Sequence, residues 1–148
     1  MRRNPFIFMV AIALACGGGG GSSSSQDLDP AFSGSWTGPA TLSISGETPQ
    51  NYTARLVIAV SGQNATFSDV CLDGSGSLTI HGSGRSATWT GNYACPPVAF
   101  TNCSAVTATF TSASVVLNGS ALSAQGSGTA SGCGQSKAFT ITMTGSKA

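Results

Sequence analysis

The chain has 148 residues, of which six are basic and five are acidic, so its formal net charge is only +1. Charged side chains make up 7% of the sequence, whereas soluble domains usually carry about 25%. The small net charge argues against nucleic-acid binding through a basic surface, and no apolar run is long enough for a membrane-spanning helix. The hydrophobic share of 41% argues against a disordered chain, which combines low hydrophobicity with high net charge.

The first 15 residues have the layout of an export signal. Two arginines follow the initiating methionine and precede a ten-residue apolar run at positions 6–15. That run has the length of a signal-peptide core and is too short to cross a bilayer. Its small residues at positions 13 and 15 fit a cleavage site after Ala15.

Cys16 directly follows this site, so the segment resembles the lipobox of bacterial lipoproteins. In that family the cysteine becomes the mature N-terminus and carries acyl chains, which implies a stable membrane anchor at Cys16. Residues 17–25 read GGGGGSSSS, a flexible linker with a reach of about 15–18 Å. Gly17 in place of an aspartate favours the outer membrane, with the protein facing the periplasm or the cell surface. The alternative is an ordinary secretory signal that leaves a free Cys16.

The rest of the chain predicts a single all-β domain. We assign residues 1–15 to the signal, residues 16–33 to the linker and lead-in, and residues 34–148 to the domain. Gly, Ser and Thr interrupt every helical period, while apolar residues recur at every second position, most clearly at the even positions of 52–60. The opposite faces are mostly Ser and Thr, which indicates an antiparallel meander with a hydroxyl-rich outer face.

Turn-forming residues divide this domain into eight expected strands. They lie near residues 35–45, 51–61, 64–72, 77–81, 85–94, 104–117, 121–131 and 136–145. The sixth segment changes its apolar phase between Phe110 and Val115, which one bulge at residues 112–114 or a division into two strands would explain. Eight antiparallel strands with short turns predict an up-and-down barrel, because closure removes exposed edges. A β-sandwich is the alternative fold.

The sequence FSGSW at residues 32–36 contains a G-x-W motif. The chain therefore resembles the calycins, the lipocalin and avidin-like barrels, at its first strand. The resemblance implies a basic side chain from near the last strand packed over Trp36. Lys147 is the nearest candidate, and Arg85 could approach from the same end.

The same resemblance implies a small hydrophobic ligand inside the barrel. The inward-facing aromatic residues Trp89, Tyr93 and Phe67 could line its site. The alternative is that these aromatic side chains simply fill the interior, as is common in small barrels.

Four cysteines remain once Cys16 is set aside, and an exported chain favours paired cysteines. In the eight-strand arrangement Cys71, Cys95, Cys103 and Cys133 all fall at the same rim, whereas nine strands would move Cys133 to the opposite end. We therefore expect two disulfides and predict the pairs Cys95–Cys103 and Cys71–Cys133. A zinc site built from the same thiolates is the rival, but the spacings lack C-x2-C, so we expect no metal.

The sequence offers few groups for acid–base chemistry. The only histidine, His81, is expected to face solvent at a turn. Asp69 shares the inward phase of Phe67, so a regular strand would point its carboxylate inward, whereas a bulge would turn Val70 inward instead. Nucleophile-elbow and triad motifs are absent. We expect a protein that is not an enzyme and that uses no cofactor.

Three functions fit these features. The first is a non-enzymatic envelope lipoprotein with a binding or structural role, attached to a membrane through lipidated Cys16. The second is a carrier of a small apolar ligand whose mouth is the cysteine rim. The third is an inhibitor of an exported protease or lysozyme, in which the segment from Cys95 to Cys103 offers Phe100 to a protein partner.

Overall fold

A computed structural model of the protein describes residues 25–100 and 102–148. The expected signal peptide, Cys16 and almost all of the Gly/Ser linker lie outside these residues. The described part contains one short 3-10 turn, η1 (Pro30–Phe32), and nine strands. The strands are β1 (Gly34–Ile44), β2 (Gln50–Ser61), β3 (Asn64–Ser68), β4 (Ser77–Ser83), β5 (Ser86–Ala94), β6 (Val98–Phe100), β7 (Cys103–Asn118), β8 (Ala121–Gly132) and β9 (Gln135–Lys147).

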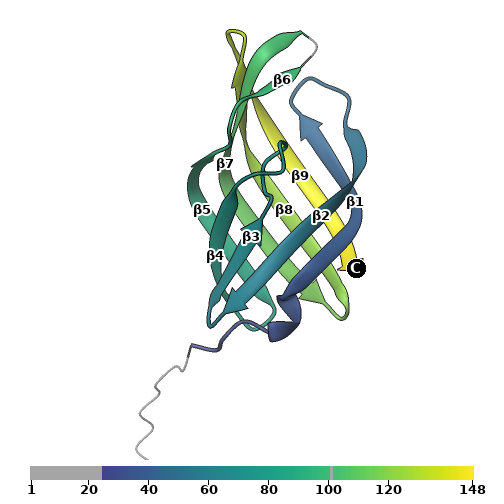
Figure 1. Cartoon of the computed structure of the whole chain (residues 1–148), viewed down its shortest axis with the longest axis vertical. Coiled ribbons are helices and arrows are strands. Elements are labelled where there is room, and N and C mark those ends of the chain that lie inside the picture. The colour runs from purple at the N-terminus through teal and green to yellow at the C-terminus, as the bar shows by residue number, and fades with distance from the viewer. Residues whose placement is uncertain (1–24, 101) are drawn as a thin grey trace, which may run out of the picture.

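Eight of these strands form a closed antiparallel ring (Figure 1). Neighbouring strands pair from β1 to β5, β5 pairs with β7, and the meander continues through β8 to β9. The last strand then returns to the first, with Leu42 opposite Ile141. The prediction of an all-β, up-and-down meander closed as a barrel is confirmed, and β6 is an additional strand on the edge of β7.

β7 is one continuous strand, although its inward-facing residues change from even-numbered to odd-numbered positions between Phe110 and Val115. The register between β7 and β8 shifts between Phe110 and Ser112, so Thr111 is the extra residue of a bulge. The bulge allows Phe110 to line the interior cavity and Val115 to lie in the buried core of the same ring. The single bulge is therefore confirmed, although it lies one residue before the expected range of 112–114.

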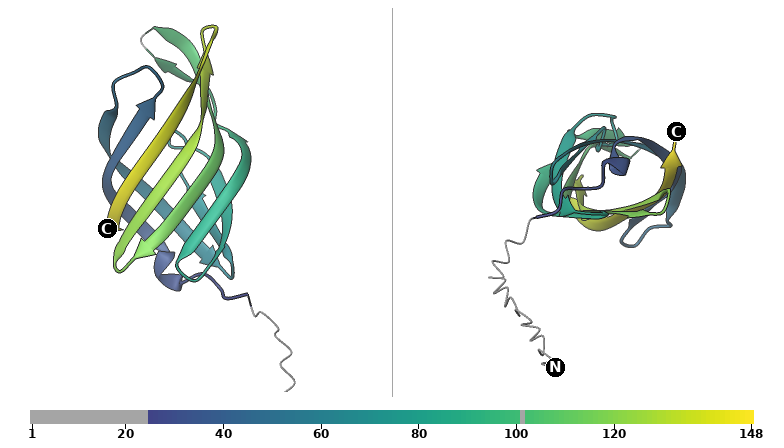
Figure 2. Two further views of the ribbon diagram at one scale, coloured as in Figure 1. Left: turned by 180° about the vertical axis from the view of Figure 1, so that it is seen from behind. Right: turned by 90° about the horizontal axis from the view of Figure 1, so that it is seen from below.

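One end of the ring, which we call the sealed end, is closed by the segment that precedes β1 (Figures 1 and 2). Leu28 is 2% exposed and forms a parallel bridge with Gly84, and Phe32 is fully buried. The indole Nε1 of Trp36 donates a hydrogen bond of 2.8 Å to the carbonyl oxygen of Phe32. The ammonium group of Lys147 lies 5.5 Å from the Trp36 ring, a cation–π contact. Of the two basic residues considered for a place over Trp36, Lys147 is therefore the one that contacts its ring.

Arg85 fastens the lead-in and two turns together at the sealed end. Its Nη1 lies 3.7 Å from Oδ2 of Asp29. Its Nε and Nη2 donate to the carbonyl oxygens of Leu117 and Gly119 at 2.9 and 2.6 Å. The guanidinium therefore joins the start of the domain to the turn between β7 and β8, rather than covering Trp36.

The buried core is concentrated toward the sealed end. Its largest fully buried side chains come from the lead-in and from four strands: Phe32, Trp36, Ile80, Val115 and Leu122. Because alternate residues of each strand face inward, the sequence pattern and the core agree. The opposite end carries strand β6 and the loops of residues 69–76, 95–97 and 133–134, and we call it the disulfide end.

Candidate binding site at the disulfide end

Two disulfides join the loops of the disulfide end. Cys71 is bonded to Cys95 with a Cα–Cα distance of 5.6 Å, and Cys103 is bonded to Cys133 with a Cα–Cα distance of 5.8 Å. All four cysteines lie at one rim, as expected from the eight-strand arrangement. Their presence indicates an oxidising, exported environment.

The pairing that we predicted from the sequence is wrong. The ring places β3 and β8 on opposite sides, so a Cys71–Cys133 bond would have to cross its open end, whereas a disulfide joins Cα atoms less than about 7 Å apart. Each cysteine instead bonds across to the neighbouring part of the sheet. Cys103 starts β7 beside the end of β8, and Cys95 follows β5 beside the loop that leads into β4. The spacing of the cysteines in the sequence favoured the short loop between Cys95 and Cys103. It could not show which parts of the sheet are neighbours in the folded ring.

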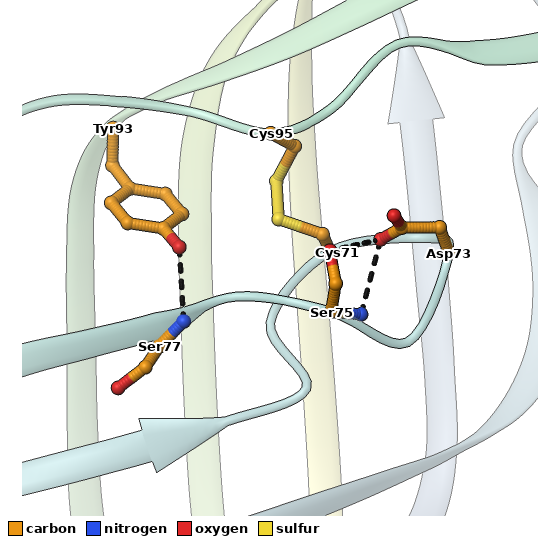
Figure 3. The surroundings of a disulfide bond; sticks show 6 residues. All are labelled: Cys71, Asp73, Ser75, Ser77, Tyr93 and Cys95. Atoms are coloured by element: carbon orange, nitrogen blue, oxygen red, sulfur yellow. Dashed lines mark hydrogen bonds between the residues drawn. A yellow bond between two sulfur atoms is a disulfide. The ribbon is translucent and has the colours of Figure 1, made fainter.

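The loop of residues 69–76 is fixed to β5 by two contacts (Figure 3). One is the Cys71–Cys95 bond, and the other is a hydrogen bond of 2.9 Å from the backbone N–H of Ser77 to the hydroxyl oxygen of Tyr93. Gly76 adopts φ +88° between these contacts, and a Cβ there would overlap the Tyr93 hydroxyl. The loop therefore leans toward β5.

Within the loop, Asp73 caps its own turn (Figure 3). Its Oδ1 accepts hydrogen bonds from the hydroxyl and the backbone N–H of Ser75 at 2.6 and 3.1 Å. The hydrogen bond from the Ser75 side chain, followed by the bond from its backbone, lowers the pKa of the Asp73 carboxyl. Asp73 is therefore held as a carboxylate at the rim.

Asp69 does not point into the barrel. Its backbone has φ +62°, which breaks the alternation of β3, and its side chain is exposed. Val70 lines the interior instead. Of the two alternatives that the sequence left open, the irregular backbone with an inward valine is the one observed.

An apolar cavity of about 120 Å³ lies in the interior. Its walls include Ala54 and Leu56 of β2, Phe67 of β3, Val70, Phe110 of β7 and Met143 of β9. Pockets for drug-sized ligands measure about 300–1,000 Å³, whereas a cavity of about 150 Å³ admits a benzene molecule. The space therefore suits one small apolar group rather than a long-chain ligand.

The three aromatic residues that we proposed as ligand contacts have different positions. Phe67 lines the cavity, but Trp89 and Tyr93 are not part of its wall. Trp89 is half-buried and packs close to Gly91, while Tyr93 accepts the hydrogen bond from Ser77. Sequence phase identified all three as inward-facing but could not show which of them the packing uses.

The two most exposed large apolar side chains of the described residues lie at the disulfide end. Phe100 on β6 is 53% exposed, and Leu72, next to Cys71, is 57% exposed. Phe100 does not lie in a loop closed by its own disulfide, because Cys95 and Cys103 bond elsewhere. We did not predict Leu72 as a contact residue, although a leucine between a cysteine and a Gly-rich turn was a visible signal.

The candidate acid–base residues do not come together in one site. His81 is exposed, as expected, but it lies within strand β4 rather than at a turn, on the outer wall opposite the buried face of Ile80. Among residues 25–100 and 102–148 no group of three His, Cys, Asp or Glu side chains could hold a metal ion.

Comparison with known proteins adds no family: no family model, curated protein or solved structure matches the chain. No helix in the described part of the chain is long and apolar enough to cross a membrane. The closed β-ring, the two disulfides and the small cavity are therefore the features from which a function is argued.

Proposed function

We propose that the protein is a lipoprotein of the bacterial cell envelope, anchored through lipidated Cys16, whose disulfide end has a non-enzymatic binding role. One observation carries the proposal: the chain enters the ring at the sealed end, and β6 lies at the opposite end (Figure 1). The exposed Phe100 belongs to β6, and the exposed Leu72 belongs to the loop of residues 69–76 at the disulfide end. An N-terminal anchor would place the sealed end toward the membrane and leave the disulfide end free.

Further features agree with this orientation. The linker of residues 17–25 has a reach of about 15–18 Å, so it would hold the ring close to the membrane without fixing its angle. An exposed apolar or aromatic side chain on a rigid support can serve as an anchor that enters a pocket of a protein partner. The two disulfides supply that rigidity to the loops that carry them.

The anchor is tested by labelling in the native host. Radioactive palmitate should enter the wild-type protein and should be absent from the Cys16→Ser variant, which should leave the membrane fraction. Equal labelling of the two proteins would show that Cys16 is not the lipidated residue. An unlabelled wild-type protein in the soluble fraction would favour an ordinary secreted protein.

The partner is tested separately, by substituting the exposed side chains. Inhibition of a panel of exported proteases and lysozymes would identify a partner class, and Phe100→Ala or Leu72→Ala should weaken that inhibition at least tenfold. The exposed Val116→Ala on the outer wall of β7 is the matched control. Absence of inhibition across the panel removes the inhibitor function.

A second function, transport of a small apolar molecule, is favoured by the interior cavity. The side chains and backbone around its volume of about 120 Å³ include no titratable group. Native mass spectrometry of protein purified from its own host should then show an added mass no larger than that of a benzene-sized compound. Protein that always emerges without a ligand would exclude this function.

A further inference from the structure

The wall of the ring is only half as high on the side of β3 and β4 (Figure 1). The pairing of β2 with β3 extends from Val57–Ser68 to Ser61–Asn64 and stops there. On its other side, β2 pairs with β1 as far as Gln50. Residues 50–56 of β2 therefore have no strand partner, within the described residues, on the side away from β1. We call this side of residues 50–56 the open edge.

The backbone groups that face the open edge follow from the alternation of an antiparallel strand. The N–H of Val60 donates to the hydroxyl of Ser33, just before β1, so even-numbered residues of β2 face β1. Odd-numbered residues face β3 where β3 is present. Continuing this series, Asn51, Thr53 and Arg55 direct their N–H and C=O groups to the open edge.

The fixed contacts of the loop of residues 69–76 hold it toward β5 rather than toward this edge. These contacts are the Cys71–Cys95 bond and the neighbouring Ser77–Tyr93 hydrogen bond. Within the described residues, no hydrogen bond joins the loop to residues 50–56. The loop is therefore joined to β5, while the backbone groups of the open edge receive no hydrogen bond from it.

The interior cavity lies behind the open edge. Ala54 and Leu56, whose side chains alternate with the free backbone groups, line it together with Phe67 and Val70. A strand laid along the edge would place every second side chain toward the interior. The volume of about 120 Å³ fits one or two small apolar side chains.

The carboxylates of the 69–76 loop indicate which kind of side chain would lie at one end of such a strand. The ion pairs of the described residues are Arg85–Asp29 and Lys137–Glu47, and neither involves the carboxylates of the 69–76 loop. Asp69 follows the last paired residue of β3, so it lies at the lower limit of the open edge, and Asp73 is further along the same loop. Both are exposed, and a basic side chain would complement them.

We propose that the open edge of β2 binds an extended peptide segment by strand addition. The peptide backbone bonds to Asn51, Thr53 and Arg55, a small apolar side chain enters the cavity, and a Lys or Arg lies at the end beside Asp69. Strand addition of this kind obtains affinity from main-chain hydrogen bonds and specificity from alternate side-chain pockets. The proposal is independent of the membrane anchor and of the contacts made by Leu72 and Phe100.

The test uses a displayed library of random octapeptides, selected on the full-length protein purified in detergent. We expect enriched peptides with Val or Ala at alternate positions and a basic residue at one end. Thr53→Pro removes one N–H from the open edge, and its neighbour across the strand pair is already Pro39, so the β1–β2 ladder is retained. Enriched peptides should bind this variant at least tenfold more weakly, and should bind the matched Thr53→Ala control within about twofold of the wild type.

Two further measurements keep the test decisive if Thr53→Pro unfolds. Ala54→Leu fills the cavity and Asp69→Asn removes the charge, and each should reduce binding at least threefold. Hydrogen exchange followed by NMR should slow at Asn51, Thr53 and Arg55 when an enriched peptide is added. Failure to enrich alternating peptides, or protection at β6 instead, would overturn the proposal. Protection of the three amides in the free protein would mean that a second copy of the chain covers the edge.

Discussion

At the sealed end the ring is filled by Trp36 and Phe32, whereas at the disulfide end two covalent bonds hold loops around a partly empty interior. The first end gains stability from buried apolar surface, at about 25 cal/mol per Å². The second has a cavity in place of part of that surface, and cross-links restrict the unfolded chain instead. The comparison teaches that a small domain can leave part of its interior unfilled if disulfides replace the missing packing there.

The largest test of this difference compares the two tryptophans. Trp36→Ala should lower the free energy of unfolding by about 4 kcal/mol, because it empties a fully buried site. Trp89→Ala should cost about half as much, because its side chain is half-buried beside Gly91. Urea denaturation of both variants gives the measurement. Equal losses would mean that the half-buried site of Trp89 is packed as tightly as the fully buried site of Trp36.

Removal of a disulfide is expected to have the next largest effect on the free energy of unfolding. Each disulfide closes a loop with a sequence separation of 24 or 30 residues, for which the chain-entropy model gives about 3.5 kcal/mol. Replacing Cys71 and Cys95 by Ala should cost more than replacing Cys103 and Cys133, because the first pair is buried while Cys133 is exposed. Mild reductant should likewise open Cys103–Cys133 first, as followed by alkylation and mass spectrometry. Simultaneous reduction would contradict this order.

The same enlargement of a side chain should act in opposite directions at the cavity wall and at a filled, fully buried site. Ala113→Val extends into the cavity and should raise the free energy of unfolding by about 1 kcal/mol. Ala65→Val adds the same two carbons to a fully buried site on β3 and should lower it by about 2 kcal/mol. Thermal unfolding of the pair measures both. Destabilisation by both substitutions would indicate that the cavity cannot accept a larger group.

The smallest expected effect is a pH dependence located at the disulfide end. The pKa of Asp73 is lowered in the folded protein by its hydrogen bonds to Ser75, so its stabilising contribution is present above the unfolded value of about 3.9. That contribution disappears as pH falls from about 4 through the lower folded pKa. The Asp73→Ala variant should lack this component of acid destabilisation in unfolding curves recorded from pH 7 to pH 2. Identical pH profiles would show that the turn at Asp73 adds no stability.

The sequence predicted the fold because period-two alternation and turn residues are local signals, and short turns limit how successive strands can pair. The same signals placed the four cysteines at one rim. They could not give the disulfide partners, because those depend on which strands are neighbours after the ring closes. They also could not show the half-height wall, since β3 ends at Ser68 and the next residue, Asp69, adopts a positive φ that the alternation pattern does not reveal.

The candidate site was predicted less completely for a related reason. The alternation pattern identified Phe67 as an inward-facing residue. Whether such a side chain lines a cavity or fills one depends on all its neighbours across the ring. Val70 entered the cavity wall because of the irregular backbone at Asp69, and Phe110 reached it with the help of the bulge at Thr111. Irregular positions of this kind interrupt the alternation on which sequence-based reasoning depends.

The pairing of β1 with β9 also determines when the ring can be completed. A chain delivered from its N-terminus exposes strands β1 to β8 as an open sheet until Gln135–Lys147 arrives, and both edges of that sheet are free to pair. During this interval β9 of a second copy could join β1, giving a swapped dimer that keeps every strand pairing of the monomer. The tight turn between β8 and β9, which delivers the last strand of the same chain quickly, opposes this exchange.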